Sequence, residues 1–262
     1  MNNLGLAFIG ELIKLKNSSI VWITFIAFSL APIMGGVFMW ILQDPHALSR
    51  AGALAAKANA MNFSQSWDSY FNILSQAVGV GGIMVFGFVI SWLFGREYTE
   101  GTAKDLLSLP TSRTTILNAK FMVYCIWCVS LVLLNLIIGW MVGFIFHLAP
   151  LAPNQLLLKL SHYFITTLLA ILVGFPIAFF AIWGKGYLAP LGFVALTLVI
   201  SQIVAAAGFG NYFPWSIPGL FSGAAGEFKT GLHAISYLIL IGIALTGYIT
   251  TILYWNKADQ ST

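Results

Sequence analysis

Residues 95–120 read GREYTEGTAKDLLSLPTSRTTILNAK and carry seven charged side chains, in a chain of 262 residues with only 12 basic and 8 acidic ones. We call this stretch the polar island. On both sides of it the sequence is apolar over lengths that suffice to cross a bilayer. The island is therefore expected to lie in water at a membrane surface and to be the part of the chain that meets soluble partners.

The composition of the chain is that of an integral membrane protein. Hydrophobic residues make up 59% of it, charged residues only 8%, and the mean hydropathy is +0.90, whereas soluble domains hold about 25% charged residues. We expect an all-α fold with a single transmembrane domain over residues 1–262. The net charge of +4 does not indicate nucleic-acid binding, because the Lys and Arg residues are scattered over the loops instead of forming a patch.

Charge-free apolar runs predict six transmembrane helices, since about 20 such residues span the hydrocarbon core. They cover about residues 20–42, 71–94, 121–146, 160–183, 187–207 and 232–255. Six spans place both termini on one side of the membrane. Eight Lys and Arg lie on that side and four on the other, so the positive-inside rule places the termini and the polar island in the cytoplasm.

Three segments outside the spans have patterns of their own. In residues 1–18 the apolar side chains recur every three or four positions, which predicts an amphipathic helix in the membrane interface. Residues 43–70 read as a large external loop. Residues 208–231 are too apolar for a free loop and too rich in Pro and Gly for a span, so we expect a broken segment that dips back into the outer membrane surface.

Known catalytic and nucleotide-binding patterns are missing from the sequence. The one Gly-Lys pair, Gly184-Lys185, lacks the other positions of a P-loop. The four histidines lie too far apart for a local metal-ligand pattern. Cys125 and Cys128 form a C-x-x-C inside an apolar helical run, where two buried thiols are expected. We therefore expect no catalytic residues, no cofactor and no metal in this chain.

The predicted spans contain no Asp or Glu. Ion-driven carriers keep such groups in the membrane to bind the coupling ion, so this class of transporter is disfavoured. The neutral polar residues within the spans are candidates for a translocation path or, alternatively, for hydrogen bonds between helices. They include Gln76, Asn135, Ser201 and Gln202.

Within the polar island, residues 97–109 are predicted to form a short helix. Glu100 and Lys104 lie four apart in the favourable order. Pro110 ends the helix, because the residue before a proline disfavours helical geometry, and the Thr-Ser pair that follows can cap the helix that enters the third span. Such an element, joined to two spans, can convert a push from a docked protein into movement of both. The alternative is a solvated loop whose charges only fix the topology.

The island also resembles a known family. The residues from Arg96 to Arg113, REYTEGTAKDLLSLPTSR, together with Lys120, resemble the cytoplasmic signature of type-2 ABC transporter permeases, in the branch of bacitracin-exporter-like and lantibiotic-immunity permeases. That signature runs approximately R-E, E-G-T-x-K, L-L-x-x-P-x-S-R and a lysine that enters the next helix, and each position is matched. The resemblance extends over the whole chain, from the amphipathic N-terminal helix to the broken segment before the last span.

This resemblance implies a permease subunit of an ATP-driven exporter for an amphipathic substrate, such as a peptide antibiotic or drug. It implies a dimer with a second permease, identical or related. It also implies two cytoplasmic ABC ATPase subunits, which bind ATP and Mg and dock at a coupling helix between the second and third spans. The residues implied in this coupling are Arg96, Glu97, Glu100, Gly101, Thr102, Lys104, Pro110 and Arg113.

Two other hypotheses stay open at the level of the sequence. One is an ATP-independent immunity or receptor-like membrane protein that binds a peptide at its external loops. The other is a membrane-embedded enzyme that uses His147, His162 or His233. The first predicts that no ATPase subunit associates with the chain, and the second predicts that replacing these histidines abolishes an activity.

Overall fold

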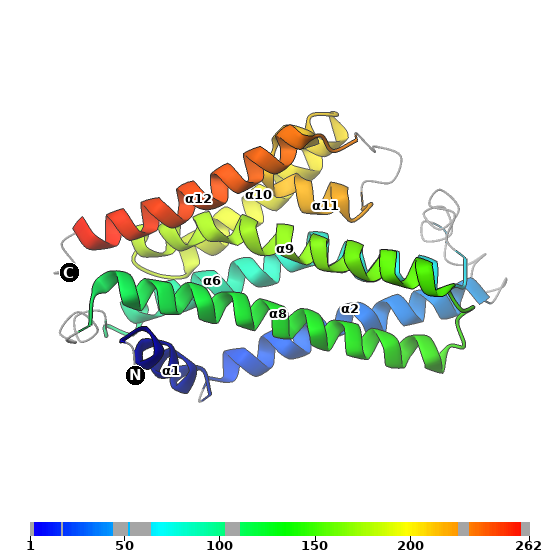
Figure 1. Ribbon diagram of the computed structural model, residues 1–262, viewed down its shortest axis with the longest axis horizontal. Helices are drawn as coiled ribbons and strands as arrows, with labels where there is room; N and C mark the ends of the chain where they lie inside the picture. Colours follow the sequence, from blue (N-terminus) through cyan, green and yellow to red (C-terminus); the bar gives the residue numbers. More distant parts are fainter. Residues whose placement is uncertain are drawn as a thin grey trace.

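The fold is a bundle of long helices that run side by side (Figure 1). The structure, a computed structural model, describes residues 3–16, 18–43, 52, 64–102, 111–224 and 231–257. Within these residues six helical stretches are long and apolar enough to cross a membrane, which confirms the six predicted spans. They are α2 (Ser19–Gln43), the continuous unit of α5 (Trp67–Gln76), the π-helical turn η1 (Ala77–Gly81) and α6 (Gly82–Thr99), then α8 (Arg113–Ile145), α9 (Pro153–Trp183), α10 (Leu188–Ala206) and α12 (Ala234–Lys257).

Three of these stretches are much longer than the predicted spans: the unit of α5, η1 and α6 with 33 residues, and the helices α8 and α9. α8 and α9 hold 33 and 31 residues, which at 1.5 Å per residue is about 45–50 Å, against a hydrocarbon core of about 30 Å. α8 starts at Arg113 instead of residue 121 because Ser112 caps it: the Ser112 hydroxyl oxygen accepts the N–H of Thr115 at 3.2 Å. α8 therefore carries the last part of the polar island, including Lys120, into the bundle.

The helix α9 packs chiefly against α6 and α12. Gly247 of α12 lies so close to α9 that an added Cβ would be 2.5 Å from the Cα of Pro176, an approach that only a small residue allows. Fully buried tyrosines also tie neighbouring helices together by donating their hydroxyl hydrogens to backbone carbonyls, which satisfies polar groups in the apolar interior. These bonds run from Tyr70 to Pro32, from Tyr124 to Ile171 and from Tyr163 to Val132.

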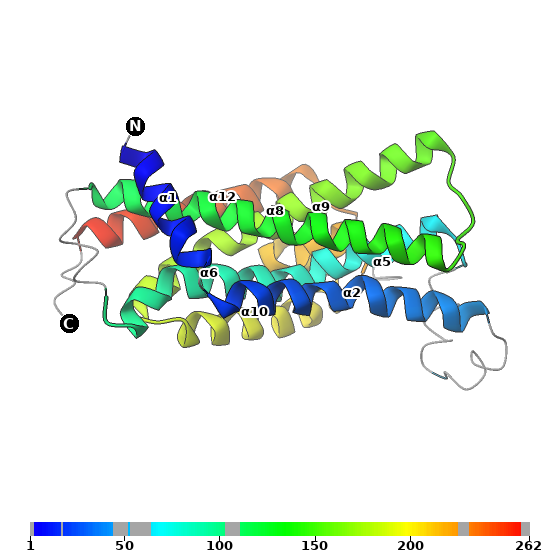
Figure 2. The ribbon, with the colours of Figure 1, turned by 90° about the horizontal axis from the view of Figure 1, so that it is seen from below.

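The N-terminal helix α1 (Asn3–Lys16) lies across the long helices at one end of the bundle, against α8 (Figure 2). Leu6, Ile9 and Ile13 form its exposed face, whereas Glu11 on the opposite face is buried. The end of α12 lies at the same end of the bundle as α1 (Figure 1), as an even number of spans requires.

Between α10 and α12 the chain forms the predicted broken segment. It consists of η2 (Gly210–Tyr212), η3 (Pro214–Ser216) and α11 (Ile217–Phe221). The side chain of Ile217 is fully buried and packs in an apolar cluster with Trp215 and Leu240, so the segment is sheltered by the protein. Residues 225–230 of this segment, and residues 44–51 and 53–63 of the predicted external loop, lie outside the described residues.

Candidate functional site

The polar island begins inside α6 and ends that helix with a glycine cap. The Thr102 N–H donates to the carbonyl of Glu97 at 2.9 Å, and the Gly101 N–H donates to that of Tyr98 at 3.3 Å. Gly101 has a φ of +72°, a left-handed conformation that glycine adopts at the least cost, and these two bonds satisfy carbonyls at the helix end. The sequence Glu-Gly-Thr is therefore a helix stop.

This stop corrects one sequence prediction. The helix expected over residues 97–109 is not a separate element where the structure describes it: residues 97–99 are helical but form the last turn of α6, and the helix ends at the cap residue Glu100. The other island residues, 103–110, lie outside the described residues. These residues include Lys104 and Pro110, so the predicted pair of Glu100 with Lys104 also lies outside the described residues.

The island ends on α8, whose first turn is tied to the last span. The Arg113 side chain donates from Nη1 to the carbonyl of Trp255 at 3.3 Å. The ring of Trp255 also meets the ring of Tyr98 edge-on, with 5.9 Å between centroids. Asn256 donates from Nδ2 to the hydroxyl of Thr114 at 3.2 Å. The ends of α6, α8 and α12 are thereby held together next to the island.

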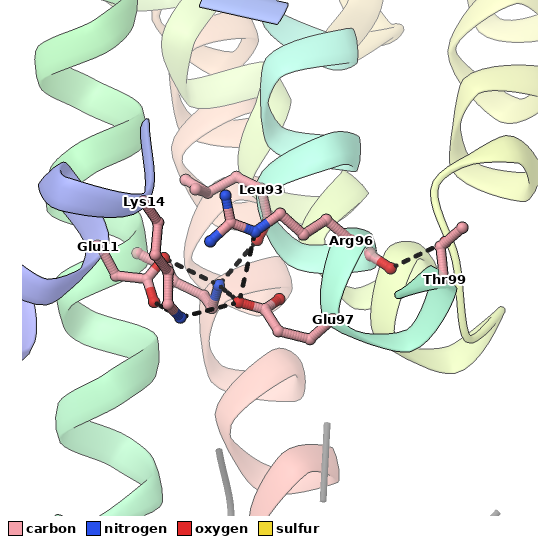
Figure 3. Close-up of polar contacts among 8 residues, drawn as sticks. Glu11, Lys14, Leu93, Arg96, Glu97 and Thr99 are labelled. Atoms are coloured by element: carbon pink, nitrogen blue, oxygen red, sulfur yellow. Dashed lines mark hydrogen bonds and ion pairs between the residues drawn. The ribbon is translucent and has the colours of Figure 1, made fainter. Parts of the chain in front are cut away.

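Beside these helix ends, charged side chains join α1, α6 and α8, and all of them except Lys14 are buried (Figure 3). We call this set the ionic cluster; it consists of Glu11, Lys14, Arg96, Glu97 and Lys120. The Nζ atom of Lys120 is its centre, at 2.6 Å from Glu97 Oε1, 3.1 Å from Glu11 Oε2 and 2.9 Å from the carbonyl oxygen of Leu93. An ammonium group has three hydrogens to donate, so each of them has an acceptor.

The remaining basic groups surround the two carboxylates. The Nζ atom of Lys14 is 2.7 Å from Glu11 Oε1 and 3.5 Å from Glu97 Oε1. The Nε atom of Arg96 is 3.9 Å from Glu97 Oε1, and its guanidinium lies over the ring of Trp92, 4.8 Å from the centroid. With three cations and two anions, the cluster neutralises both acids and keeps one positive charge in excess.

The ionisation of Glu11 follows from these contacts. Burial alone raises its pKa, but the Coulombic attraction of Lys120 and Lys14 and the hydrogen bonds from both ammonium groups outweigh burial and lower the pKa from 4.5 to about 2. Glu11 is therefore a carboxylate at neutral pH. Charges buried in this way persist only while they are paired, so the contact among the three helices is obligatory.

The structure divides the predicted coupling residues into two groups. Arg96 and Glu97 are only 6% and 3% exposed, so their side chains bind inside the bundle and do not reach a soluble partner. The residues that do offer surface are Glu100, Gly101 and Thr102, which are exposed, and Arg113, which is half-buried.

Sequence reasoning missed Glu11. It is the one acidic residue in residues 1–18 and falls off the apolar stripe of the predicted helix, a pattern that favours a position in water. The signal that points to it is Lys120: a lysine inside a long apolar helix needs an acidic partner, and both Glu97 and Glu11 supply one.

The neutral polar residues predicted for a translocation path are not brought together. Ser201 and Gln202 line a cavity of about 260 Å³ among η1, α10 and the broken segment. Asn135 is buried elsewhere, where it donates to a backbone carbonyl of α2 at 3.3 Å and accepts from the hydroxyl of Tyr163 at 3.0 Å. Gln76 is half-buried at the end of α5. Only the first two residues therefore share a cavity.

The described histidines and cysteines do not form a metal site either. Among the described residues no group of three or more His, Cys, Asp or Glu is placed to hold a metal ion. Cys125 and Cys128 are free thiols, and the second is buried. His162 is bonded through Nε2 to the carbonyl of Phe221 at 2.8 Å, so it links α9 to the broken segment, while His147 is exposed in the turn after α8.

The region that holds the site matches a known family. A family model described as ABC-2 family transporter protein matches residues 7–203, which include Glu11, the polar island and α8. A protein named bacitracin transport permease protein BCRB, from Bacillus licheniformis, is 27% identical over 179 residues, which cover 68% of this chain and 85% of that protein. The family match begins within α1 and ends within α10.

Proposed function

Because this chain belongs to the ABC-2 family of transporter proteins, we propose that it is an export permease for an amphipathic substrate, driven by ATP hydrolysis in partner subunits. ABC-2 permeases lack an ATPase domain of their own and work with ATPase subunits. ATP and Mg are thus bound by the partners. In our proposal two ATPases and a second permease, either a further copy or a related chain, complete the transporter.

The polar island supports this proposal because of how it is attached. Its exposed cap residues, Glu100 to Thr102, follow directly on α6, and its far end is the first turn of α8. The two helices are bonded to each other through Glu97 and Lys120 at 2.6 Å. An ATPase that presses on the cap therefore moves both spans together and not one of them alone.

The orientation of the chain belongs to the same proposal. The excess of basic residues on the side of the termini favours the cytoplasm for α1, for the island and for the end of α12. The exposed apolar face of α1, with Leu6, Ile9 and Ile13, fits a helix that lies in the membrane interface. The broken segment before α12 then belongs to the outer half of the membrane.

For the substrate we propose an amphipathic peptide antibiotic, and bacitracin is the first to test because the relative from Bacillus licheniformis bears its name. We assign Ser201 and Gln202 to the path. Their cavity of about 260 Å³ lies below the range of roughly 300–1,000 Å³ that is typical of pockets for drug-sized ligands. It must therefore widen during transport.

The test is co-purification of the tagged permease with the ATPase subunits of its own cell, combined with measurement of bacitracin resistance. The informative variant is Glu100→Lys, which reverses a charge on the exposed cap. The matched control is Lys257→Glu, a charge reversal on the exposed last residue of α12, next to Asn256, which bonds to the start of α8. We expect the first variant to lose bound ATPase and resistance at least about fivefold, the lower end of ordinary coupling energies, and the control to retain both.

Two results would contradict the proposal. If no ATPase associates with the wild-type chain, the chain works without ATP and the immunity or receptor hypothesis takes its place. If the ATPase binds but Glu100→Lys binds it equally well and confers full resistance, the contact lies elsewhere than on the cap of α6.

A further inference from the structure

We infer that α1 is a moving part of the coupling machinery, positioned by Glu11 and Lys120 so that it follows the polar island when the ATPases act. The inference rests on the proposed function, because it concerns what the movement of the island does next. Both residues are positioning residues: each acts by holding helices together and not by touching a nucleotide or a substrate.

The first step is the connection between helices. Among the described residues α1 packs extensively only against α8. Its polar contacts with α6 converge on Glu97: Lys14 reaches it directly at 3.5 Å, and Glu11 reaches it through the ammonium of Lys120. A displacement of α6 therefore passes to α1 through charged groups in contact (Figure 3).

The second step is the stiffness of that connection. Each hydrogen of the Lys120 ammonium has an acceptor, and both carboxylate oxygens of Glu11 are engaged, Oε1 by Lys14 and Oε2 by Lys120. The side chains of Glu11, Glu97 and Lys120 are only 3–4% exposed, so water does not replace a lost partner. Separating the helices would leave buried charges unpaired, and the three helices therefore move together more readily than they separate.

The third step is what α1 carries with it. α1 leads into α2, and the Ser18 N–H donates to the carbonyl of Leu15 at 2.9 Å at the junction. Movement of α1 therefore reaches the first span. The polar island is covalently joined to α6 and α8, and the ionic cluster connects both to α1 and thereby to α2. A movement of the island therefore reaches three spanning helices.

Distances between spin labels in the complete transporter test this inference. Exposed positions suit the labels: Ile13→Cys on α1, Thr99→Cys at the end of α6 and Leu157→Cys at the far end of the bundle. The native thiols are first replaced in a Cys125→Ala and Cys128→Ala background. Pairs of labels are then measured in lipid nanodiscs with bound ATPase, without nucleotide and with ATP, Mg and vanadate.

We expect the distance from α1 to the end of α6 to stay the same in both states, while the distances from each of them to Leu157 change. If the wild-type transporter responds to nucleotide but α1 keeps its distance to Leu157, the inference is overturned and the proposed function stands. If wild-type chain neither binds ATPase nor responds, the proposed function fails and the inference fails with it. The labelled variants keep all five residues of the ionic cluster, so this experiment does not depend on whether a variant of a buried residue folds.

A second arm uses Glu11→Gln, with the conservative variant Glu11→Asp as control. In Glu11→Gln we expect the distances between α1 and α6 to broaden and bacitracin transport per bound ATPase to fall about fivefold or more. The Asp variant keeps the charge and is expected to recover most of the transport. Full transport by Glu11→Gln with ATPase bound would overturn the positioning role, and so would a loss that Asp does not relieve.

Discussion

Replacing Lys120 by Met removes the centre of the ionic cluster but keeps a long, unbranched side chain. In the folded protein the ammonium lies 2.6 Å from Glu97 and 3.1 Å from Glu11. Without it both buried carboxylates lose a close partner, and removing one partner from a buried ion pair costs about 3–5 kcal/mol. We expect Lys120→Met to lower the free energy of unfolding by that amount.

The companion variant Glu11→Gln is expected to cost less, about 1–3 kcal/mol. Lys120 then still has Glu97 and the carbonyl of Leu93 as acceptors. In the double variant the side chain at position 11 no longer has the Lys120 ammonium to lose, so the two losses do not add. The double variant should be more stable than the sum of the single losses predicts, by about 0.5–3 kcal/mol.

The assay is reversible unfolding of the purified permease in mixed micelles by SDS, followed by tryptophan fluorescence. Lys16→Met is the matched control, because it makes the same replacement at an exposed position of α1, where changes stay within about 0.5 kcal/mol. A Lys120→Met variant within about 1 kcal/mol of wild type, or losses that add in the double variant, would refute the buried pairing on which the coupling argument depends.

Three further outcomes are expected. The pKa of Glu11 falls from 4.5 to about 2 on folding, so its carboxylate adds about 3 kcal/mol to the free energy of unfolding at a pH above its unfolded pKa. This contribution is lost as the pH falls toward 2. The free energy of unfolding should therefore fall less steeply between pH 5 and about 2 in Glu11→Gln than in the wild type. Gly247→Ala should lower the free energy of unfolding by about 1–3 kcal/mol, because the added carbon forces α12 away from α9. Gly242→Ala is the control and should not lower it, since nothing lies within 4 Å of the added carbon. SDS unfolding of both variants measures the difference. Asn135→Leu should lose about 1–2 kcal/mol by the same measurement, because the buried carbonyl of Phe28 loses its side-chain donor. Bacitracin resistance per folded permease should stay unchanged, and a selective loss of resistance would return this residue to the translocation path.

Much of the fold was predictable because the membrane permits few solutions. Backbone polar groups must be satisfied within each segment in lipid, so long apolar runs have to be helices, and all six were found from hydropathy. The ends of the helices could not be predicted from hydropathy, because the helices continue beyond the apolar runs into polar sequence. α8 begins at Arg113 since Ser112 caps it, and α6 runs to Thr99 since the cap with Gly101 stops it there. Consequently Glu97 lies on a spanning helix, although none of the predicted spans held an acid.

The sequence located the polar island, but it did not predict which of its charged side chains are buried. The family resemblance implied that Arg96 and Glu97 take part in the contact with a partner, and their place in a polar stretch was compatible with exposure to water. Their burial depends on Lys120 and on Glu11, and the latter lies 109 residues from the lysine that binds it. A single sequence does not reveal that two charged residues so far apart form a pair, since each of them alone is equally compatible with exposure to water.

The wide separation of the charges in the ionic cluster also orders its assembly during synthesis. Glu11 leaves the ribosome first, Glu97 follows, and Lys120, which binds both, comes last. At about 5–20 residues per second, the nascent chain holds Glu11 for on the order of 5–20 seconds before its main partner emerges. During that interval α1 has no lysine of α8 to hold it against the bundle. The N-terminal helix therefore docks only after the third span begins to enter the membrane, and a chain cut short before Lys120 leaves both acids without this partner.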